Sequence, residues 1–443
     1  MNVRFWGTRG SIATPGSRTS RYGGNTSCVA VTSDQGTLVI LDCGTGARLL
    51  GDHLLQTCEP PIHGYIFLTH THWHHIQGFP FFAPAFVATN EFMIYGPTGG
   101  AHHLEQALAG QMQYTYFPVE LERLGASLRC RDIGEGAFHL DDVQVCCQYL
   151  NHPALTLGYR LTIGDATVVY CTDHESFSPV LVKQDTTRPT LDAIVHDGDR
   201  RHAEFLRGAD LVIHDAQYTA QEYEAKRNWG HSSIDYVVGV ACAASVKRLA
   251  LFHHDPDHDD TMLDAIQEQA RSLVAAWQEA LDVFCAREGD EIHLEEGAHA
   301  RPRRTGHPSP HLEPESRRIL IVDDDALIRE LVQDILEEEG YLLEFARDGE
   351  EALARVAARP PDLILLDLRI PKIDGLSVLE RLRSSDTTHD LPIIMLTAAD
   401  DTTEQGFKAG ATDYMTKPFS ESHLRARISS WLLRTAESPS PVP

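Results

Sequence analysis

The chain has 443 residues, too many for one ordinary hydrophobic core, so two or three domains are expected. Asp and Glu outnumber Lys and Arg by 64 to 38, and the formal net charge of -26 argues against direct binding to DNA or to acidic membranes. No apolar run, at the start or elsewhere, approaches the ~20 residues of a membrane span, and nine cysteines without a CxxC pair are typical of reduced thiols, which predicts a cytoplasmic protein.

Residues 1–295 contain many apolar runs of strand length. Strands are expected at 28–32, 37–41, 65–69, 143–146, 159–162, 167–171 and 211–214, and helices at 233–246 and 262–281. This pattern predicts a mixed α/β domain built as a sandwich of sheets with outer helices.

Four histidines follow the strand expected at 65–69: His70, His72, His74 and His75. Imidazoles so closely spaced at a strand-to-helix turn can point at one spot, so the run predicts a metal site.

Further candidate ligands follow later strands, namely His152, Asp173 and His253. The first two histidines of the run would form one metal position with His152, and His75 would form a second with His253. Asp173 could bridge the two, because a carboxylate has two oxygens. Bridged ions lower the pKa of a water toward neutrality and make a nucleophile available.

Residues 1–295 resemble the metallo-β-lactamase fold, in its phosphodiesterase and ribonuclease Z-like branch. Besides the metal positions, the resemblance rests on RFWGTRGSI (4–12), YGGNTSC (22–28), LDCGTG (41–46), GHSS (230–233) and LFHHDP (251–256). It implies an αββα sandwich that binds two transition-metal ions, with zinc expected and iron or manganese as alternatives. Asp42 would support the metal-binding loop without touching the metal. Asp173 and His231 would be the catalytic residues, with His231 facing the substrate phosphate as a proton donor.

The chain departs from this family at one ligand. The family motif is HxHxDH, whereas this chain has His74 at the position of the Asp. That Asp ordinarily binds the second metal and holds the attacking water, and histidine removes its negative charge and its proton acceptor. Three outcomes stay open: a working His-rich dinuclear site, a site with one metal, and a site with metal but little hydrolysis. Such a site could also hold iron.

Other histidines in this region receive no ligand role. His214 is expected outside the metal shell or in strand packing, and His174, His196, His254 and His258 stay unassigned neighbours of the site.

Residues 296–317 are rich in proline and poor in large apolar residues, which predicts a solvated linker. A compact domain is expected at 318–435, followed by a disordered tail at 436–443.

Strands and helices alternate in this compact domain. Apolar strands are expected at 319–322, 363–366, 392–397 and 413–416, and helices at 327–340 and 375–384. Continuous apolar strands of this kind form a parallel, doubly wound sheet, with functional residues at the carboxyl ends of the strands. Asp323, Asp324 and Asp367 stand at such ends, a set of oxygen ligands suited to Mg²⁺. A carboxylate beside that ion can attack a phosphoryl donor.

This domain closely resembles the flavodoxin-like receiver domain of response regulators. The resemblance rests on VDDD (322–325), LLDLRIPKIDG (365–375), LTA (396–398) and YMTKPF (414–419). It implies that Asp367 accepts the phosphoryl group and helps the two earlier acids to bind Mg²⁺, together with the carbonyl of Arg369. Lys417, with a cis bond to Pro418, would pair with the phosphate. Thr397 and Tyr414 would form the switch pair.

Together these features predict a two-component response regulator with a phosphorylation-controlled, metal-dependent phosphodiesterase. The expected partners are a cognate sensor histidine kinase and a small phosphodiester substrate such as a cyclic nucleotide, and a homodimer stays open. The alternative is a metal site that senses redox state or oxygen, or binds a partner, without hydrolysis. A lactonase or thioesterase shares the fold and is only weakly excluded.

Overall fold

A computed structural model describes residues 1–97, 104–178, 180–182, 188–296, 317–385, 387–398, 410–419 and 421–436. The chain divides into two compact units, a larger N-terminal one and a smaller C-terminal one. The expected linker at 296–317 and tail at 436–443 lie almost entirely outside the described residues, so the domain boundaries stay predictions.

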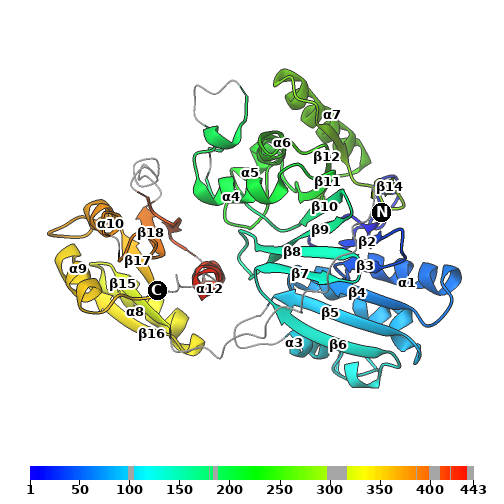
Figure 1. Cartoon of the computed structure of the whole chain (residues 1–443), viewed down its shortest axis with the longest axis horizontal. Coiled ribbons are helices and arrows are strands. Elements are labelled where there is room, and N and C mark those ends of the chain that lie inside the picture. The colour runs from blue at the N-terminus through cyan, green and yellow to red at the C-terminus, as the bar shows by residue number, and fades with distance from the viewer. Residues whose placement is uncertain are drawn as a thin grey trace. The chain divides into compact units, whose positions relative to one another are not determined.

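The N-terminal unit contains two seven-stranded sheets (Figure 1). The first has the order β14 (Glu291–His293), β1 (Asn2–Gly7), β2 (Cys28–Thr32), β3 (Leu38–Leu41), β4 (His63–Phe67), β5 (Glu91–Pro97) and β6 (Ser127–Ile133). The second has the order β13 (Asp282–Cys285), β12 (Arg248–Phe252), β11 (Leu211–Asp215), β10 (Ala166–Cys171), β9 (Leu157–Ile163), β8 (Val143–Tyr149) and β7 (Gly136–Leu140). Strands β3 to β6 are parallel, as are β10 to β13, so their carboxyl ends meet at common edges.

Helices cover the outer faces of the two sheets. The first sheet carries α1 (Gly46–Thr57) and α3 (Leu104–Gln111), and the second carries α4 (Asp197–Leu206), α6 (Ile234–Ala243) and α7 (Asp260–Ala276). The short helices α2 (Trp73–Ile76) and α5 (Ala220–Tyr223) lie in the connections that follow β4 and β11. Short 3-10 helices lie at Phe79–Phe81, Ala83–Phe86, Leu121–Arg123 and Leu191–Ala193. The buried side of α1 packs into the core of the first sheet, and α6 and α7 pack into that of the second.

Aromatic rings fill the space between the two sheets. The rings of Phe67 on β4 and Tyr159 on β9 are 5.0 Å apart, and those of Phe5 on β1 and Phe252 on β12 are 6.2 Å apart. The first contact is edge-on and the second is tilted, and both bury large apolar area between the sheets. The layers therefore run helix, sheet, sheet, helix, which confirms the predicted αββα sandwich.

Two helices are shorter than their sequence pattern predicts. The helix expected at 262–281 is α7, which begins earlier because Asp259 caps it by accepting the backbone N–H groups of Thr261 and Met262. It ends at Ala276, and Gln278 then adopts a left-handed backbone with φ 55°. The helix expected at 233–246 ends at Ala243, before Ser245 turns left-handed with φ 53°. After each left-handed residue the chain continues to the next strand, β12 after Ser245 and β13 after Gln278.

The C-terminal unit is a parallel five-stranded sheet, as predicted. Its order is β16 (Leu342–Ala346), β15 (Arg318–Val322), β17 (Leu363–Asp367), β18 (Ile393–Ala398) and β19 (Asp413–Lys417). Its helices are α8 (Ala326–Leu336), α9 (Gly349–Ala358), α10 (Gly375–Arg383) and α12 (Glu421–Ala436), with a 3-10 turn at Glu337–Glu339. One core joins the sheet to α9 and α10, and another joins its opposite face to α8 and α12. Both faces are covered, which explains the continuous apolar strands.

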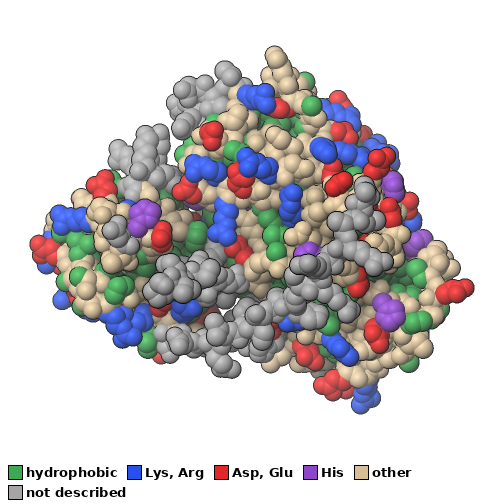
Figure 2. Space-filling view, in the orientation of Figure 1, with side chains coloured by type: hydrophobic (Ala, Val, Ile, Leu, Met, Phe, Trp, Pro, Cys, Tyr) green, Lys and Arg blue, Asp and Glu red, His purple; other side chains and the backbone are tan. Residues whose placement is uncertain are grey.

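The described helices include none that is both long and apolar enough to cross a membrane. On the face seen in Figure 2, the Lys and Arg side chains are interspersed with Asp and Glu side chains.

Candidate functional site

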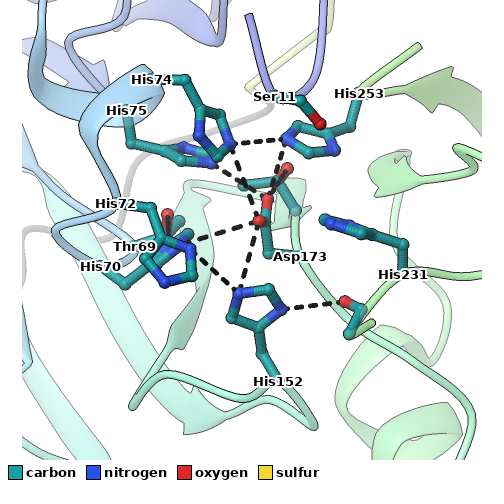
Figure 3. A network of polar contacts seen from close by, with 12 residues as sticks. Ser11, Thr69, His70, His72, His74, His75, His152, Asp173, His231 and His253 are labelled. Atoms are coloured by element: carbon teal, nitrogen blue, oxygen red, sulfur yellow. Dashed lines mark hydrogen bonds and ion pairs between the residues drawn. The ribbon is translucent and has the colours of Figure 1, made fainter. Parts of the chain in front are cut away.

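The predicted metal ligands lie at the carboxyl ends of strands from both sheets. The run of four histidines follows β4 and leads into α2, while His152 follows β8, Asp173 follows β10 and His253 follows β12. Figure 3 shows the imidazoles converging around the Asp173 carboxylate. The sheet order thus brings together residues that are up to 183 positions apart, from His70 to His253.

Asp173 belongs to three groups of potential ligands. The first is His70, His72, His152 and Asp173, the second is His74, His75, His253 and Asp173, and the third is Asp173, Asp215, His231 and His253. The first two, which contain the predicted ligands, are the two ligand groups. Asp173 Oδ2 lies 3.6 Å from His70 Nε2 and 3.7 Å from His152 Nε2. Asp173 Oδ1 lies 3.1 Å from both His75 Nε2 and His253 Nε2. Oδ2 therefore faces two imidazoles of the first group, and Oδ1 faces two imidazoles of the second.

His74, which replaces the family's Asp, reaches the second group. Its Nε2 lies 3.2 Å from His253 Nε2 and 3.9 Å from Asp173 Oδ2, and its side chain is mostly buried. Each of the two ligand groups then consists of three imidazoles and the shared carboxylate.

Oxygen acceptors outside these groups orient the imidazoles. The Nδ1–H groups of His75, His152 and His253 donate to Asp42 Oδ2 at 2.8 Å, to the Gly230 carbonyl at 2.9 Å and to Gln217 Oε1 at 3.0 Å. Because Nδ1 carries a proton in each case, Nε2 is the ring nitrogen that is left to face the Asp173 carboxylate.

Asp42 lies behind the histidine run, where the resemblance places a supporting residue. Its carboxylate also accepts the Thr69 backbone N–H at 2.8 Å and the Tyr170 hydroxyl at 2.9 Å. Asp42, Asp173 and His253 all have left-handed backbones, with φ of 58°, 58° and 60°. Such conformations cost about 1–3 kcal/mol in residues other than glycine and cluster at functional sites.

Three buried polar atoms at the centre of Figure 3 fit a bound cation. His70 Nε2, His75 Nε2 and Asp173 Oδ2 have no hydrogen-bond partner among the described residues. Buried polar atoms without partners are costly, and ions held by the two ligand groups would satisfy them. The donor set of imidazoles and carboxylate suits zinc or iron.

Protonation states in the two groups also suit metal binding. Burial lowers the pKa of His74 to about 2 and that of His152 to about 3, so both imidazoles are neutral and able to bind a metal. Burial alone would raise the pKa of Asp173, but the imidazoles of His253, His75 and His70 hold it well below its usual range. His75 is the exception, because Asp173 and Asp42 overcome burial and raise its pKa to about 10. A cation at His75 Nε2 would take the place of that proton.

His231 and Asp215 form a pair beside the metal ligands. His231 Nδ1 donates to Asp215 Oδ2 at 2.6 Å, and the His231 ring lies 5.0 Å from the His253 ring and 5.5 Å from the His152 ring. Burial alone would lower the pKa of His231, but the Asp215 carboxylate raises it above its ordinary value. Asp215 was not predicted as a site residue. Its place at the carboxyl end of β11 was the available signal.

His214 belongs to a separate group with His174 and His202, the last of which was not predicted. His214 Nδ1 donates to the Asp215 carbonyl at 2.7 Å, so its Nε2 accepts the His202 Nε2–H at 2.8 Å. This distance fits a hydrogen bond better than two ligands around an ion. His254 and His258 bond elsewhere, to the Ala286 carbonyl and Glu222, and His196 Nδ1 accepts the backbone N–H of Gly198.

The C-terminal unit has its acids at one edge of the sheet. Asp323, Asp324 and Asp367 form a group that could hold a cation, and Asp367 is nearly buried. Lys417 Nζ donates to Asp323 Oδ2 at 2.7 Å and to Asp367 Oδ2 at 2.8 Å, and its bond to Pro418 is cis.

The other residues that the resemblance assigns to this pocket lie nearby in the fold. The Arg369 backbone N–H donates to Asp367 Oδ1 at 3.3 Å. Thr397 and Tyr414 are buried on the neighbouring strands β18 and β19.

Two family models match the chain. The "Beta-lactamase superfamily domain" matches residues 37–254, and the "Response regulator receiver domain" matches residues 319–429. Among curated proteins, the "DNA-binding dual master transcriptional regulator RpaA" of Synechocystis is 46% identical over 124 residues, which are 28% of this chain and 52% of that protein. The chain thus spans about half the length of the curated relatives it matches.

Solved structures resemble each unit separately. The receiver domain of a Francisella response regulator is 36% identical and covers 27% of this chain and 98% of its own, with a TM-score of 0.25. The metallo-β-lactamase-fold protein YhfI of Bacillus subtilis is 18% identical over 66% of this chain and 99% of its own, with a TM-score of 0.46. The chain thus contains a β-lactamase superfamily domain at 37–254 and a response regulator receiver domain at 319–429.

Proposed function

We propose that the N-terminal domain is a metal-dependent phosphodiesterase and that phosphorylation of Asp367 controls it. The main support for hydrolysis is the His231–Asp215 pair, which lies beside both groups of metal ligands. A protonated imidazole in that place can give its proton to a leaving oxygen, as cleavage of a phosphodiester requires.

The two ligand groups would hold two ions, zinc first and iron or manganese as alternatives. When bound, such ions stabilise charge on phosphoryl oxygens and lower the pKa of an attacking water. Within the chain, Asp173 links the two positions, and Asp215 keeps the His231 Nδ1 proton and ring in place. The Asp323, Asp324 and Asp367 group would bind Mg²⁺ during phosphorylation by a cognate sensor histidine kinase.

A small diester, such as a cyclic nucleotide, is the proposed substrate. The net charge of -26 and the mixed charges in Figure 2 disfavour long polyanions, including transfer RNA. They also support the absence of direct DNA binding. The DNA-binding relative RpaA matches this chain over only 124 residues, 28% of its length.

The test combines metal analysis with turnover. Full-length protein purified without added metal should contain two transition-metal ions by mass spectrometry. It should hydrolyse a bis-aryl phosphodiester or a cyclic nucleotide, at different rates before and after treatment with acetyl phosphate and Mg²⁺. If the protein holds both ions and is inactive both before and after phosphorylation, the proposed phosphodiesterase activity is wrong.

A sensor is the second candidate, supported by His74. With His74 as a ligand, the two positions share a single carboxylate, and imidazole-rich sites suit redox-active iron. Iron content with a reversible spectral change on reduction, and no turnover, would favour this candidate.

A further inference from the structure

A buried carboxylate outside both ligand groups holds a segment that reaches the metal centre. Glu175 follows β10 and is 5% exposed. Its Oε1 accepts the Tyr223 hydroxyl and the Asn228 backbone N–H, and its Oε2 accepts the Gly230 backbone N–H, each at 2.8 Å. The Glu175 side chain thus accepts hydrogen bonds from three residues of the segment 223–230.

This segment delivers two groups to the site. The Gly230 carbonyl accepts the Nδ1–H of His152, and the next residue is His231. Gly230 has a φ of +87°, and a Cβ there would lie 2.1 Å from His152 Nδ1. Only glycine allows the backbone to lie so close to this imidazole.

We propose that Glu175 is a positioning residue of the metal centre. Glu175 accepts the backbone N–H groups of Asn228 and Gly230 and so keeps the Gly230 carbonyl within hydrogen-bond distance of His152 Nδ1. That hydrogen bond fixes the orientation and tautomer of the His152 imidazole. Outer hydrogen-bond partners of histidine ligands typically change metal affinity by about 10- to 100-fold. The inference rests on the metal binding proposed above.

Other contacts hold the rest of the segment independently of Glu175. Thr219 and Glu222 form a capping box at the start of α5, and Glu222 also accepts from His258 at 2.9 Å. Lys226 pairs with Asp255 at 3.1 Å. Loss of the Glu175 acceptors should therefore loosen residues 228–230 and leave the preceding helix in place.

Glu175→Gln in the full-length protein tests the role in metal binding. The carboxamide keeps one acceptor oxygen and replaces the other with an NH2 group, a donor that cannot accept from a backbone N–H. Chelator competition should show about 10- to 100-fold weaker binding of one ion, the one held by the group that contains His152, and unchanged binding of the other. Glu296→Gln is a matched control, because Glu296 is 3% exposed and accepts the Asp34 backbone N–H away from the site. It should bind both ions as wild type does.

Tryptic cleavage of the metal-free protein supplies a second readout. Lys226 and Arg227 are partly exposed in this segment, so cleavage after them should be faster in Glu175→Gln and unchanged in Glu296→Gln. Tyr223→Phe removes one donor and should give a smaller effect in both assays. If Glu175→Gln does not fold, the same two assays are carried out on Tyr223→Phe.

The outcomes separate this inference from the proposed function. Wild-type protein without metal would overturn the proposed function. Wild-type protein with two ions, together with wild-type metal binding and cleavage in Glu175→Gln, would overturn the positioning role alone. An equal loss of both ions in Glu175→Gln and Glu296→Gln would also overturn it, because the effect would then be general destabilisation.

Discussion

The Asp215 carboxylate determines the protonation of His231. A buried imidazole ordinarily loses its proton easily, because burial disfavours the charged form. The 2.6 Å hydrogen bond to Asp215 reverses this and raises the pKa of His231. The imidazole is therefore protonated below its raised pKa and loses its proton, and its use as an acid, as pH rises through that value.

Asp215→Asn should shift the alkaline limit of hydrolysis to lower pH. Without the carboxylate, burial dominates and the pKa of His231 falls, so the proton is lost at a lower pH. At neutral pH kcat should drop by up to about 100- to 10,000-fold, the typical contribution of a general acid, with metal content unchanged. The measurement is a pH profile of kcat beside metal analysis. His231→Ala should show the same loss without a remaining alkaline limb, and parallel loss of metal in either variant would place the pair among the ligands instead.

His74→Asp should move the acidic limit of hydrolysis to higher pH. A carboxylate adds negative charge beside the attacking water, so the pKa of that water rises and a higher pH is needed to deprotonate it. The rate at the optimum can change in either direction, because the carboxylate also restores a proton acceptor. A profile identical to wild type would mean that His74 has no part in the site, and activity that appears only in His74→Asp would favour the sensor.

At the scale of elements, the metal centre depends on the turn between β4 and α2. The turn supplies His70 and His72 to the first group, α2 itself supplies His74 and His75 to the second, and the segments after β8, β10 and β12 each supply one residue. The first group loses two of its three imidazoles if His70 and His72 are removed, whereas the second group keeps all of its own.

The double variant His70→Ala, His72→Ala should therefore lose one metal ion and retain the other. Binding at the first position would fall to His152 and the shared carboxylate, too few ligands for a stable zinc site. Mass spectrometry of purified protein measures the stoichiometry, and a circular dichroism spectrum like that of wild type provides the control for folding. Two retained ions would contradict the assignment.

Sequence periodicity predicted 11 of the 19 strands in the described part of the chain, and the spacing of the histidines predicted that their side chains lie together. The apolar runs at 28–32, 363–366 and 413–416 are strands, and the clustered histidines of 70–75 lie together. The edge strand β16 and its following helix α9 were not predicted, because Leu342–Ala346 is only partly buried and its pattern is weak.

The partners of the site residues were harder to predict, because they come from distant segments. Asp215 meets His231 only because a loop returns from α5 to the end of β11, and Gln217 meets His253 only because β11 and β12 are neighbours. Nothing in the spacing of Glu175 and Gly230, 55 positions apart, indicates their hydrogen bond. Such contacts depend on loop geometry, which local residue patterns do not specify.

At the scale of the whole molecule, acetyl phosphate with Mg²⁺ should phosphorylate Asp367. The acid group and Lys417 already surround its carboxylate. Intact-mass analysis should show one phosphoryl adduct in wild type and none in Asp367→Asn. The hydrolytic rate of the wild-type protein should change on phosphorylation, and that of Asp367→Asn should not. An adduct that persists in Asp367→Asn would refute the assignment.

The sharing of one carboxylate between two ligand groups has an electrostatic consequence. Imidazoles, which carry no negative charge, make up the rest of both groups, so two divalent ions would keep most of their positive charge. That charge would lie inside a molecule whose net charge is -26. The outer field repels anions over about one Debye length, ~8 Å at physiological salt, while the pocket attracts an anion that comes nearer. The repulsion energy of a small, singly charged diester in the outer field is low. That of a polyanion is higher in proportion to its charge, so it is repelled before it contacts the protein.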